Sequence, residues 1–164
     1  MKIDYLPITE FSDRDWYDAY LIVYNKDIAF HMGVDPKLLA NPPSLTEFYD
    51  SINGAVKNGT GYGWAVKKGD EYTGHVILDK TTGVWEVGAV LKNPENRHKG
   101  TGVRVLMHAL KWIFEEQDEE WAIAFTQGRD PKVHEMLIRG GFRPLMKFLI
   151  MDKRTWNERW AGRV

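Results

Sequence analysis

The chain has 164 residues, no cysteine and a formal net charge of -1 at pH 7. Its length, with 43% hydrophobic and 13% aromatic residues, predicts a single domain over residues 1–164 with a substantial core. The missing cysteines exclude a disulfide framework, a thiolate nucleophile and a cysteine metal site. The near-neutral charge argues against a protein that holds nucleic acid through bulk charge.

No targeting or membrane segment is expected. The first residues, MKIDYLPITEFSDRDW, lack the apolar stretch of a signal peptide. No apolar run approaches the roughly 18 residues that a membrane-spanning helix needs. Because a chain without cysteine also fits a reducing compartment, we expect a cytoplasmic protein with no membrane partner.

The first part of the chain predicts one strand and two helices. KIDYLPI reads as a strand, and Ser12 is a suitable N-cap for a helix that we expect over residues 12–33, where aromatic residues recur at helical spacing. SLTE, at Ser44–Glu47, is a capping box that begins a second helix. Asn53-Gly54 and Asn58-Gly59 are expected to help end it.

Three strands then follow in quick succession. YGWAVKKG, EYTGHVILD and GVWEVGAVLK are separated by KKGDE and KTTG, which are connections of hairpin length. The three strands should therefore form an antiparallel meander. Three consecutive strands also argue against a doubly wound parallel sheet.

The last part of the chain predicts two more helices and two more strands. A long helix follows Gly102, because apolar residues recur at i, i+3, i+4 and i+7 from Val103 onward. WAIAFT reads as a short buried strand, DPKVHEMLIRGG as a helix with Pro131 in its first turn, and FRPLMKFLIMD as a closing strand. RTWNERW is a possible last helical turn. The pattern indicates an α+β fold with a mixed sheet and helices on its faces.

The turn before the long helix has the features of an anion-binding site. A helix N-terminus leaves backbone N–H groups unpaired and carries partial positive charge, and an anion can satisfy both. Gly100 and Gly102 permit a sharp turn and a close approach, and Arg97, His98 and Lys99 add positive charge.

The common phosphate motifs do not fit this turn, and one other motif does. The chain has no G-x-x-x-x-G-K-[ST] run, and Val105 stands where a dinucleotide fingerprint needs its third glycine. The pattern that fits is R-x-x-G-x-G, formed by Arg97, Gly100 and Gly102. Placed between a strand and a long helix, it resembles the acyl-CoA signature of the GNAT superfamily of N-acetyltransferases. The resemblance extends over Gly63–Met151 and includes the Gly141-Phe142 pair that typically ends the later helix.

This resemblance implies a fold and a set of donor-binding residues. It implies a mostly antiparallel, twisted sheet of six to seven strands, with about four helices on both faces and a splay between strands 4 and 5. The donor is acetyl-CoA, and no metal is implied. The residues implied in binding it are Arg97, His98, Lys99, Gly100, Thr101, Gly102 and Val103 at the pyrophosphate, Val90 and Leu91 through their backbone, and Asp130 where the superfamily often has asparagine.

The catalytic groups are less well matched to the superfamily pattern. Many members use a glutamate on the fourth strand as general base, and Glu86 stands there. We expect its side chain to share a face with those of Gly88 and Val90, because side chains alternate along a strand. The superfamily commonly has a tyrosine acid where this chain has Leu137. His134, one helical turn earlier, is therefore a candidate catalytic group, and solvent protonation of the thiolate is the alternative.

The sequence therefore predicts an acetyl-CoA-dependent N-acetyltransferase that acts by direct transfer to a primary amine. The acceptor could be a small molecule, a protein amine or a modified nucleobase, and a homodimer is possible. One alternative is a non-catalytic acyl-CoA-binding domain, which the missing tyrosine favours. Another is a nucleic-acid-associated modification protein that uses the basic tail around Trp156 and Trp160 to grip phosphate and stack a base.

Overall fold

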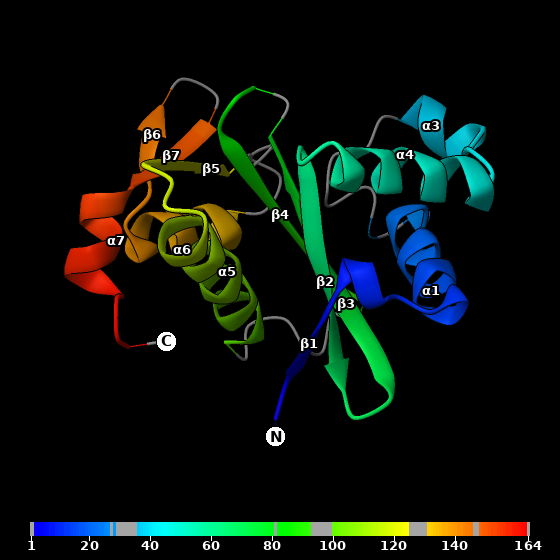
Figure 1. Ribbon diagram of the computed structural model, residues 1–164, viewed down its shortest axis with the longest axis horizontal. Helices are drawn as coiled ribbons and strands as arrows, with labels where there is room; N and C mark the ends of the chain where they lie inside the picture. Colours follow the sequence, from blue (N-terminus) through cyan, green and yellow to red (C-terminus); the bar gives the residue numbers. More distant parts are fainter. Residues whose placement is uncertain are drawn as a thin grey trace.

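The structure is a computed structural model that describes residues 2–26, 28, 36–80, 82–92, 100–124, 131–145 and 148–163. A seven-stranded sheet, in the order β1-β2-β3-β4-β5-β7-β6, runs through the middle of the molecule (Figure 1). The strands are β1 (Asp4–Pro7), β2 (Gly61–Lys68), β3 (Glu71–Asp79), β4 (Trp85–Leu91), β5 (Trp121–Ala124), β6 (Arg143–Leu145) and β7 (Phe148–Asp152). All neighbouring strands are antiparallel except β4 and β5.

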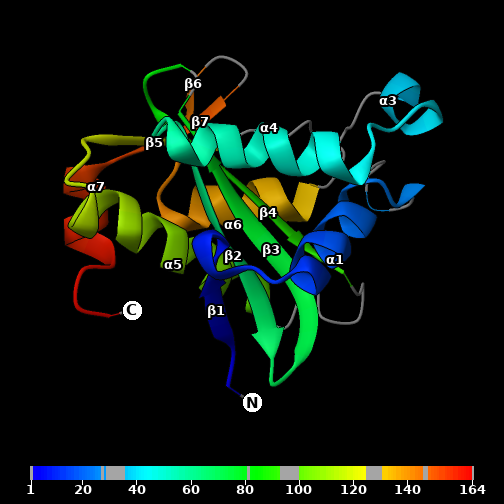
Figure 2. The same ribbon diagram turned by 45° about the vertical axis from the view of Figure 1, so that its right-hand side comes forward.

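Helices cover both faces of this sheet (Figure 2). Those that the structure describes are α1 (Asp13–Val23), α3 (Pro36–Ala40), α4 (Leu45–Lys57), α5 (Thr101–Lys111), α6 (Pro131–Gly140) and α7 (Lys153–Arg159). A 3₁₀ turn, η1 (Ile8–Glu10), follows β1, and a π-helical turn, η3 (Trp112–Glu116), continues α5. The predicted α+β class, the strand count and the mostly antiparallel sheet are confirmed.

Two predicted helix boundaries are wrong, for local reasons. The first helix ends at Val23 rather than running on, because the side chain of Asn25 accepts a hydrogen bond from the N–H of Ile28 at 3.1 Å and starts a new turn. The second helix runs through Gly54 to Lys57, so that Asn53-Gly54 does not end it, whereas Asn58 caps its end and Gly59 has φ +70°, as expected for Asn58-Gly59. A single glycine costs a helix only about 1 kcal/mol, which the packing of its apolar face can outweigh.

The predicted closing strand is in fact a hairpin of two strands. Leu145 pairs with Phe148, so that β6 turns back along β7 within the stretch that was expected to be continuous. β6 lies at the edge of the sheet. Pro144 is compatible with that place, because an edge strand can lack one backbone donor.

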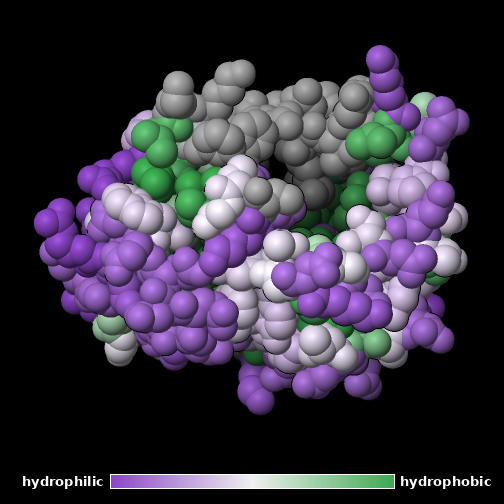
Figure 3. All heavy atoms as spheres, turned by 45° about the horizontal axis from the view of Figure 1, so that its top comes forward, coloured by the Kyte–Doolittle hydropathy of each residue, from purple (hydrophilic) through white to green (hydrophobic). Residues whose placement is uncertain are grey.

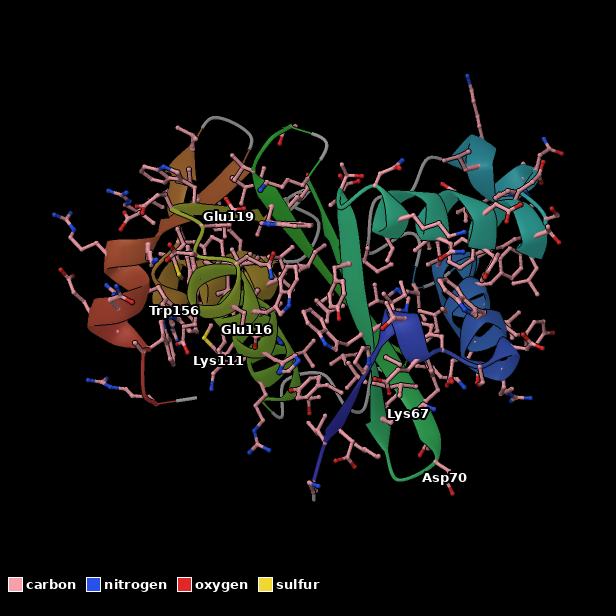
Figure 4. All side chains as sticks on the ribbon, in the orientation of Figure 1. Lys67, Asp70, Lys111, Glu116, Glu119 and Trp156 are labelled. Carbon is pink, nitrogen blue, oxygen red and sulfur yellow. The ribbon has the colours of Figure 1, made fainter. Side chains whose placement is uncertain are left out.

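The two faces of the sheet carry two separate cores. On one face, α5, α6 and α7 bury Leu110, Leu137 and Trp156, among others, against the sheet. On the other, α1 and α4 bury Ile22 and Phe48, among others. We call these the α5 face and the α1 face. Figure 4 shows Trp156 reaching from α7 toward α5, where it stacks on Phe114 and donates to Glu115 at 3.1 Å.

Aromatic contacts fix α5 and its π-helical continuation on the sheet. Trp112 stacks on Tyr62 of β2, with ring centroids 4.7 Å apart and an interplanar angle of 5°. One turn earlier, His108 stacks on Tyr5 of β1 at 3.8 Å and meets Trp64 edge-on at 4.8 Å. Such pairs add to the stabilisation from burial alone. The position of the helix start is therefore set by contacts at its other end.

A buried carboxylate fixes the start of α1. Asp15 is 4% exposed; one of its oxygens accepts from the backbone and hydroxyl of Ser12, and the other lies 2.6 Å from Nζ of Lys67 on β2 (Figure 4). Burial by itself raises the pKa of Asp15, but the hydrogen bonds from Lys67 and Ser12 together outweigh it and leave the pKa lowered. The pair therefore joins the capping box of α1 to the sheet.

We predict that Lys67→Met lowers the free energy of unfolding by about 2–3 kcal/mol, because Asp15 would remain buried without its counter-charge. Urea denaturation at pH 7 measures the change. Lys2→Met is the matched control, since Lys2 and Asp4 form a pair whose side chains are 88% and 52% exposed, and such pairs contribute little. Equal losses in the two variants would contradict an anchoring role for Asp15.

Candidate active site

The site begins where β4 and β5 part. β4 pairs with β3 from Glu86 to Leu91, but with β5 only through Trp85–Ala122 and Glu86–Ile123. Past Glu86, none of the described residues pairs with the β5 side of β4. The splay expected between the fourth and fifth strands is therefore present, and the register of β3 against β4 has no shift.

At this opening the sheet is accessible from both faces. Along β4, Trp85, Val87 and Val90 are buried, whereas Gly88 and Ala89 are exposed. Because side chains alternate along a strand, and Val90 belongs to the core under α1, Gly88 faces the α1 side and Ala89 faces the α5 side. A central strand that is exposed on both faces gives two molecules opposite routes to one point.

The backbone of β4 presents hydrogen-bonding groups to the opening. The N–H of Lys92 donates to the carbonyl of Thr73 at 2.8 Å, and in an antiparallel ladder the bonded and non-bonded pairs alternate. This alternation directs the backbone groups of Val90 toward β3. In agreement, the carbonyl oxygen of Val90 lies 2.2 Å from the place that a Cβ on Gly74 would take. The N–H and C=O groups of Ala89 and Leu91 consequently point toward the opening.

The start of α5 has no side-chain cap from its N-cap residue, in contrast to the starts of α1 and α4. α1 and α4 both begin with complete capping boxes. α5 begins at Gly100, which has φ +78° and makes no side-chain cap. Its first-turn N–H groups, from Thr101 to Val103, therefore have no side-chain cap to accept their bonds.

The two glycines of the turn differ in what the fold requires. The positive φ of Gly100 favours glycine. Gly102 has no such angle, and no described atom lies within 4 Å of a Cβ built on it, so the fold itself does not exclude a side chain there. An open surface above uncapped N–H groups suits an approaching anion. Arg97, His98, Lys99 and Asp130 lie outside the described residues.

A cavity of about 300 Å³ lies beside the start of α5, between α5, α6 and α7. Val103 and Met107 line it from α5, Lys132 and Met136 from α6, and Trp160 from α7. Its walls are mostly apolar, with charged groups from α6 at its margin. Lys132 thus lies on the same cavity as Val103 in the first turn of α5.

Glu86 is partly buried and faces a second carboxylate. In the β3–β4 register it lies directly opposite Asp79, so the two side chains share the α1 face. Burial raises the pKa of Glu86, and the negative charge of Asp79 raises it further. A carboxylate with a raised pKa beside an opening is suited to accept a proton.

Figure 3 shows the surface of the molecule hollowed near its middle, with hydrophobic residues beside the hollow.

The two positions considered for a general acid lie in different surroundings. Leu137 is 3% exposed and belongs to the core on the α5 face, so this position serves packing. His134 is exposed in the first turn of α6. No contact with Glu86 or β4 is described for it, and it stays a candidate on sequence grounds.

Two residues of the opening were not identified from the sequence. Asp79 became a neighbour of Glu86 only through the hairpin register, although the short connection between the two strands contained that information. Gly88 was named only as sharing a face with Glu86. The signal that could have found it is a glycine inside a strand, which often marks a close approach by a ligand or another backbone.

Comparison with known proteins agrees with this geometry. The sequence model of the acetyltransferase (GNAT) domain family matches residues 6–143. The chain belongs to this family. As a member it is an N-acetyltransferase with acetyl-CoA as its donor. No curated protein matches the chain.

Solved acetyltransferase structures share the fold at low sequence identity. Spermidine N-acetyltransferase from Vibrio cholerae, in complex with CoA and spermine, superposes with a TM-score of 0.77 at 14% identity, over 95% of this chain and 97% of that one. An aminoglycoside acetyltransferase in complex with coenzyme A gives a TM-score of 0.75 at 10% identity, over 96% and 98% of the two chains. A dodecameric form of the Vibrio enzyme gives 0.75 at 13% identity, over 97% and 98%.

Neither a membrane span nor a metal cluster is found in the part of the chain that the structure describes. No described helix is long and apolar enough to cross a membrane. The same residues contain no group of three or more His, Asp or Glu side chains that could hold a metal ion.

We predict that Glu86→Gln raises the melting temperature at pH 7, and that the rise shrinks as the pH is lowered through the carboxyl range. A pKa raised on folding means that ionised Glu86 opposes folding at pH values above that pKa, and that the penalty is lost once the group is protonated. The direction of the change, a higher melting temperature at pH 7 than at pH 4 relative to wild type, follows from the raised pKa. Thermal unfolding at pH 7 and pH 4 measures it.

The control is Glu71→Gln, at the exposed start of β3, which should leave the melting temperature unchanged at both pH values. A lower melting temperature for Glu86→Gln at pH 7 would show that the carboxylate stabilises the fold instead.

Proposed function

We propose that the protein transfers the acetyl group of acetyl-CoA directly to a primary amine, at the opening between β4 and β5. The observation that carries this proposal is the exposure of Gly88 and Ala89 on opposite faces of a central strand. The donor approaches from the α5 face and the acceptor from the α1 face. The two meet where the sheet is open.

The donor side uses the start of α5 and the backbone of β4. The uncapped N–H groups from Thr101 to Val103, with Arg97, His98 and Lys99 before them, suit the pyrophosphate. The free backbone groups of Ala89 and Leu91 suit an amide-containing arm laid against β4 as an added strand would be. The cavity between α5 and α6, with Lys132 at its side, suits the adenosine end. Asp130 remains a proposed contact of the arm, from its place after β5.

The chemistry at the opening needs a base, and Glu86 is proposed to provide it. Acetyl-CoA, when bound, supplies the acetyl group as a thioester. Glu86 takes a proton from the acceptor amine, directly or through water, as the nitrogen bonds to the acetyl carbon and the carbon–sulfur bond breaks. The sulfur leaves as a thiol with a proton from solvent or from His134. The buried Leu137 cannot serve as the acid.

The structure bears differently on the two alternatives. A non-catalytic binding domain would have no use for a desolvated carboxylate beside the opening, so Glu86 favours the enzyme. The proposed base-stacking tail loses its support: Trp156 is fully buried, and the indole N–H of Trp160 donates to the carbonyl of Gly140 at 2.8 Å. The acceptor amine belongs to a small molecule, a protein or a nucleobase. The protein itself acts as a monomer, a homodimer or a larger assembly.

Ligand-dependent stability tests donor binding. Acetyl-CoA at about 100 times its Kd should raise the melting temperature by about 5–10 °C, since binding at that ratio adds about 2.7 kcal/mol. No shift at saturating acetyl-CoA would refute the proposal. Turnover is then measured as free thiol released from acetyl-CoA with spermine, kanamycin and a peptide that has a free N-terminus and a lysine.

We predict that Gly102→Glu abolishes the acetyl-CoA shift without destabilising the free protein. A glutamate in the first helical turn interacts favourably with the helix dipole, and Gly102 has room for a side chain. Its carboxylate would, however, occupy the place proposed for the pyrophosphate and repel the negative charge of that group. Gly54→Glu in α4, where a Cβ likewise has open space, is the control and should keep the shift. If Gly102→Glu kept the full acetyl-CoA-dependent rise in melting temperature, the donor site would not lie at the start of α5.

We predict that Glu86→Gln lowers kcat by about 100-fold or more, the usual contribution of a general base, with acetyl-CoA binding unchanged. Asp79→Asn should instead keep kcat and move the acidic limb of the kcat/KM profile to lower pH, because the Asp79 charge helps to raise the pKa of Glu86. Steady-state kinetics from pH 5 to 9 separate the two effects. If Glu86→Gln had the same kcat as wild type, Glu86 would not be the general base.

A further inference from the structure

Among the glycines inside the strands, Gly88 is the one whose lack of a side chain the fold does not explain. A Cβ on Gly61, Gly63 or Gly74 would lie 2.8, 2.5 or 2.2 Å from an atom of a neighbouring residue in the fold. Close packing therefore requires glycine at these three positions. A Cβ on Gly88 would meet only the carbonyl oxygen of Ile77, at 3.8 Å, among the described residues. Its φ is not positive either.

Glycine at such a place weakens the strand. It loses more conformational freedom on folding than any other residue, and it has no side chain to pack on the sheet. No described residue fills the space over Gly88, so none of them accounts for the glycine. A ligand that passes close to β4 is such a cause.

The surroundings of Gly88 show which face and which chemistry are involved. On the α1 face its neighbours along β4 are Glu86 and Val90. Glu86 is desolvated at one end of the space. At the other end Val90 pairs with His75 of β3, where the surface closes under α1.

His75 brings a buried polar nitrogen without a hydrogen-bond partner among the described residues to this end of the space. Its side chain is 2% exposed, and Nε2 has no hydrogen-bond partner. Nδ1 lies 3.0 Å from the hydroxyl of Tyr72, so Nε2 is directed away from Tyr72. A buried polar nitrogen left unpaired is costly. Burial lowers the pKa of His75 to about 4, so the ring is neutral at pH 7 and one of its nitrogens can donate a hydrogen bond.

We propose that the acceptor amine lies over Gly88, between Glu86 and His75, and that the missing side chain of Gly88 determines how bulky the acceptor can be. This inference rests on the proposed function and names a residue that selects the acceptor. The reacting nitrogen lies at the Glu86 end. The remainder of the acceptor passes over Gly88, and a polar atom of it faces Nε2 of His75.

The test compares Gly88→Ala and Gly88→Val with wild type, using the amine with the best wild-type turnover and its derivative methylated at the carbon that bears the amine. Both variants should keep the melting temperature at or above that of wild type, because alanine and valine suit a strand better than glycine does. Their Kd for acetyl-CoA should stay within about twofold. Their kcat/KM should fall by about 10–100-fold, the usual result of a small misplacement of reactants, and further for the methylated amine.

Two glycine variants serve as controls. Gly54→Ala, which also fills open space, should raise the melting temperature, because alanine suits the interior of α4 better than glycine does, and should leave kcat/KM unchanged. Gly74→Ala should lower the melting temperature, because its Cβ meets a backbone carbonyl. A Gly88→Val variant that loses stability as Gly74→Ala does would show that the fold needs this glycine and would overturn the inference.

Kinetics and nuclear magnetic resonance complete the test. If wild type acetylates the amine and Gly88→Val does so equally well for both amines, the inference fails while the proposed function stands. If wild type neither binds acetyl-CoA nor releases thiol, the proposed function fails, and the inference with it. Binding of the amine should also move the ¹⁵N resonance of His75 Nε2, and productive binding without that movement would overturn the placement.

Discussion

Among the described residues, β4 and β5 pair only at Trp85–Ala122 and Glu86–Ile123, and the candidate site lies beyond these two pairs. The chain must leave β4, pass through α5 and return beside β4 as β5, which is the usual crossover for parallel neighbours. If the pairing continued, the backbone groups of Ala89 and Leu91 would be used within the sheet. No described residue pairs with Ala89 or Leu91 on the β5 side, so this edge of β4 is where the proposed ligand site lies.

The two sides of this opening are held in place by different kinds of interaction. On the α5 face, stacking of Trp112 on Tyr62 and of His108 on Tyr5 fixes the helix, so that its uncapped start lies beside the opening. On the α1 face, the buried pair of Asp15 and Lys67 fixes the start of α1. Both faces therefore depend on apolar packing, and the α1 face has a buried charge pair in addition. The two can be weakened separately.

Much of the fold was predictable because its signals are local. The N-cap at Ser12, the capping box at Ser44 and the hairpin-length connections were read correctly from adjacent residues. The helix expected after Gly102 begins slightly earlier, at Thr101. The errors arose where a local signal was weak or misleading. Asn25 restarts a helix that apolar spacing seemed to continue, and the turn between β6 and β7 lies in a stretch with no glycine or asparagine.

The site was predictable only in part, because several of its features depend on strand register. A sequence places Glu86 on a strand, but only the register brings Asp79 opposite it. It places Leu137 where an acid is commonly found, but only packing shows that this position is buried in the core.

The sequence by itself determined the family, the glycine turn before α5 and most of the order of strands and helices, because each of these depends on residues that are close together along the chain. The tertiary structure decided that β4 is open on both faces at Gly88 and Ala89, that Asp79 raises the pKa of Glu86, and that the start of α5 has no side-chain cap. The exposure of β4 on both faces depends on packing between residues far apart in sequence. The Asp79–Glu86 pair and the glycine cap of α5 involve residues that are close in sequence, but their geometry is defined only once the hairpin and the helix have formed.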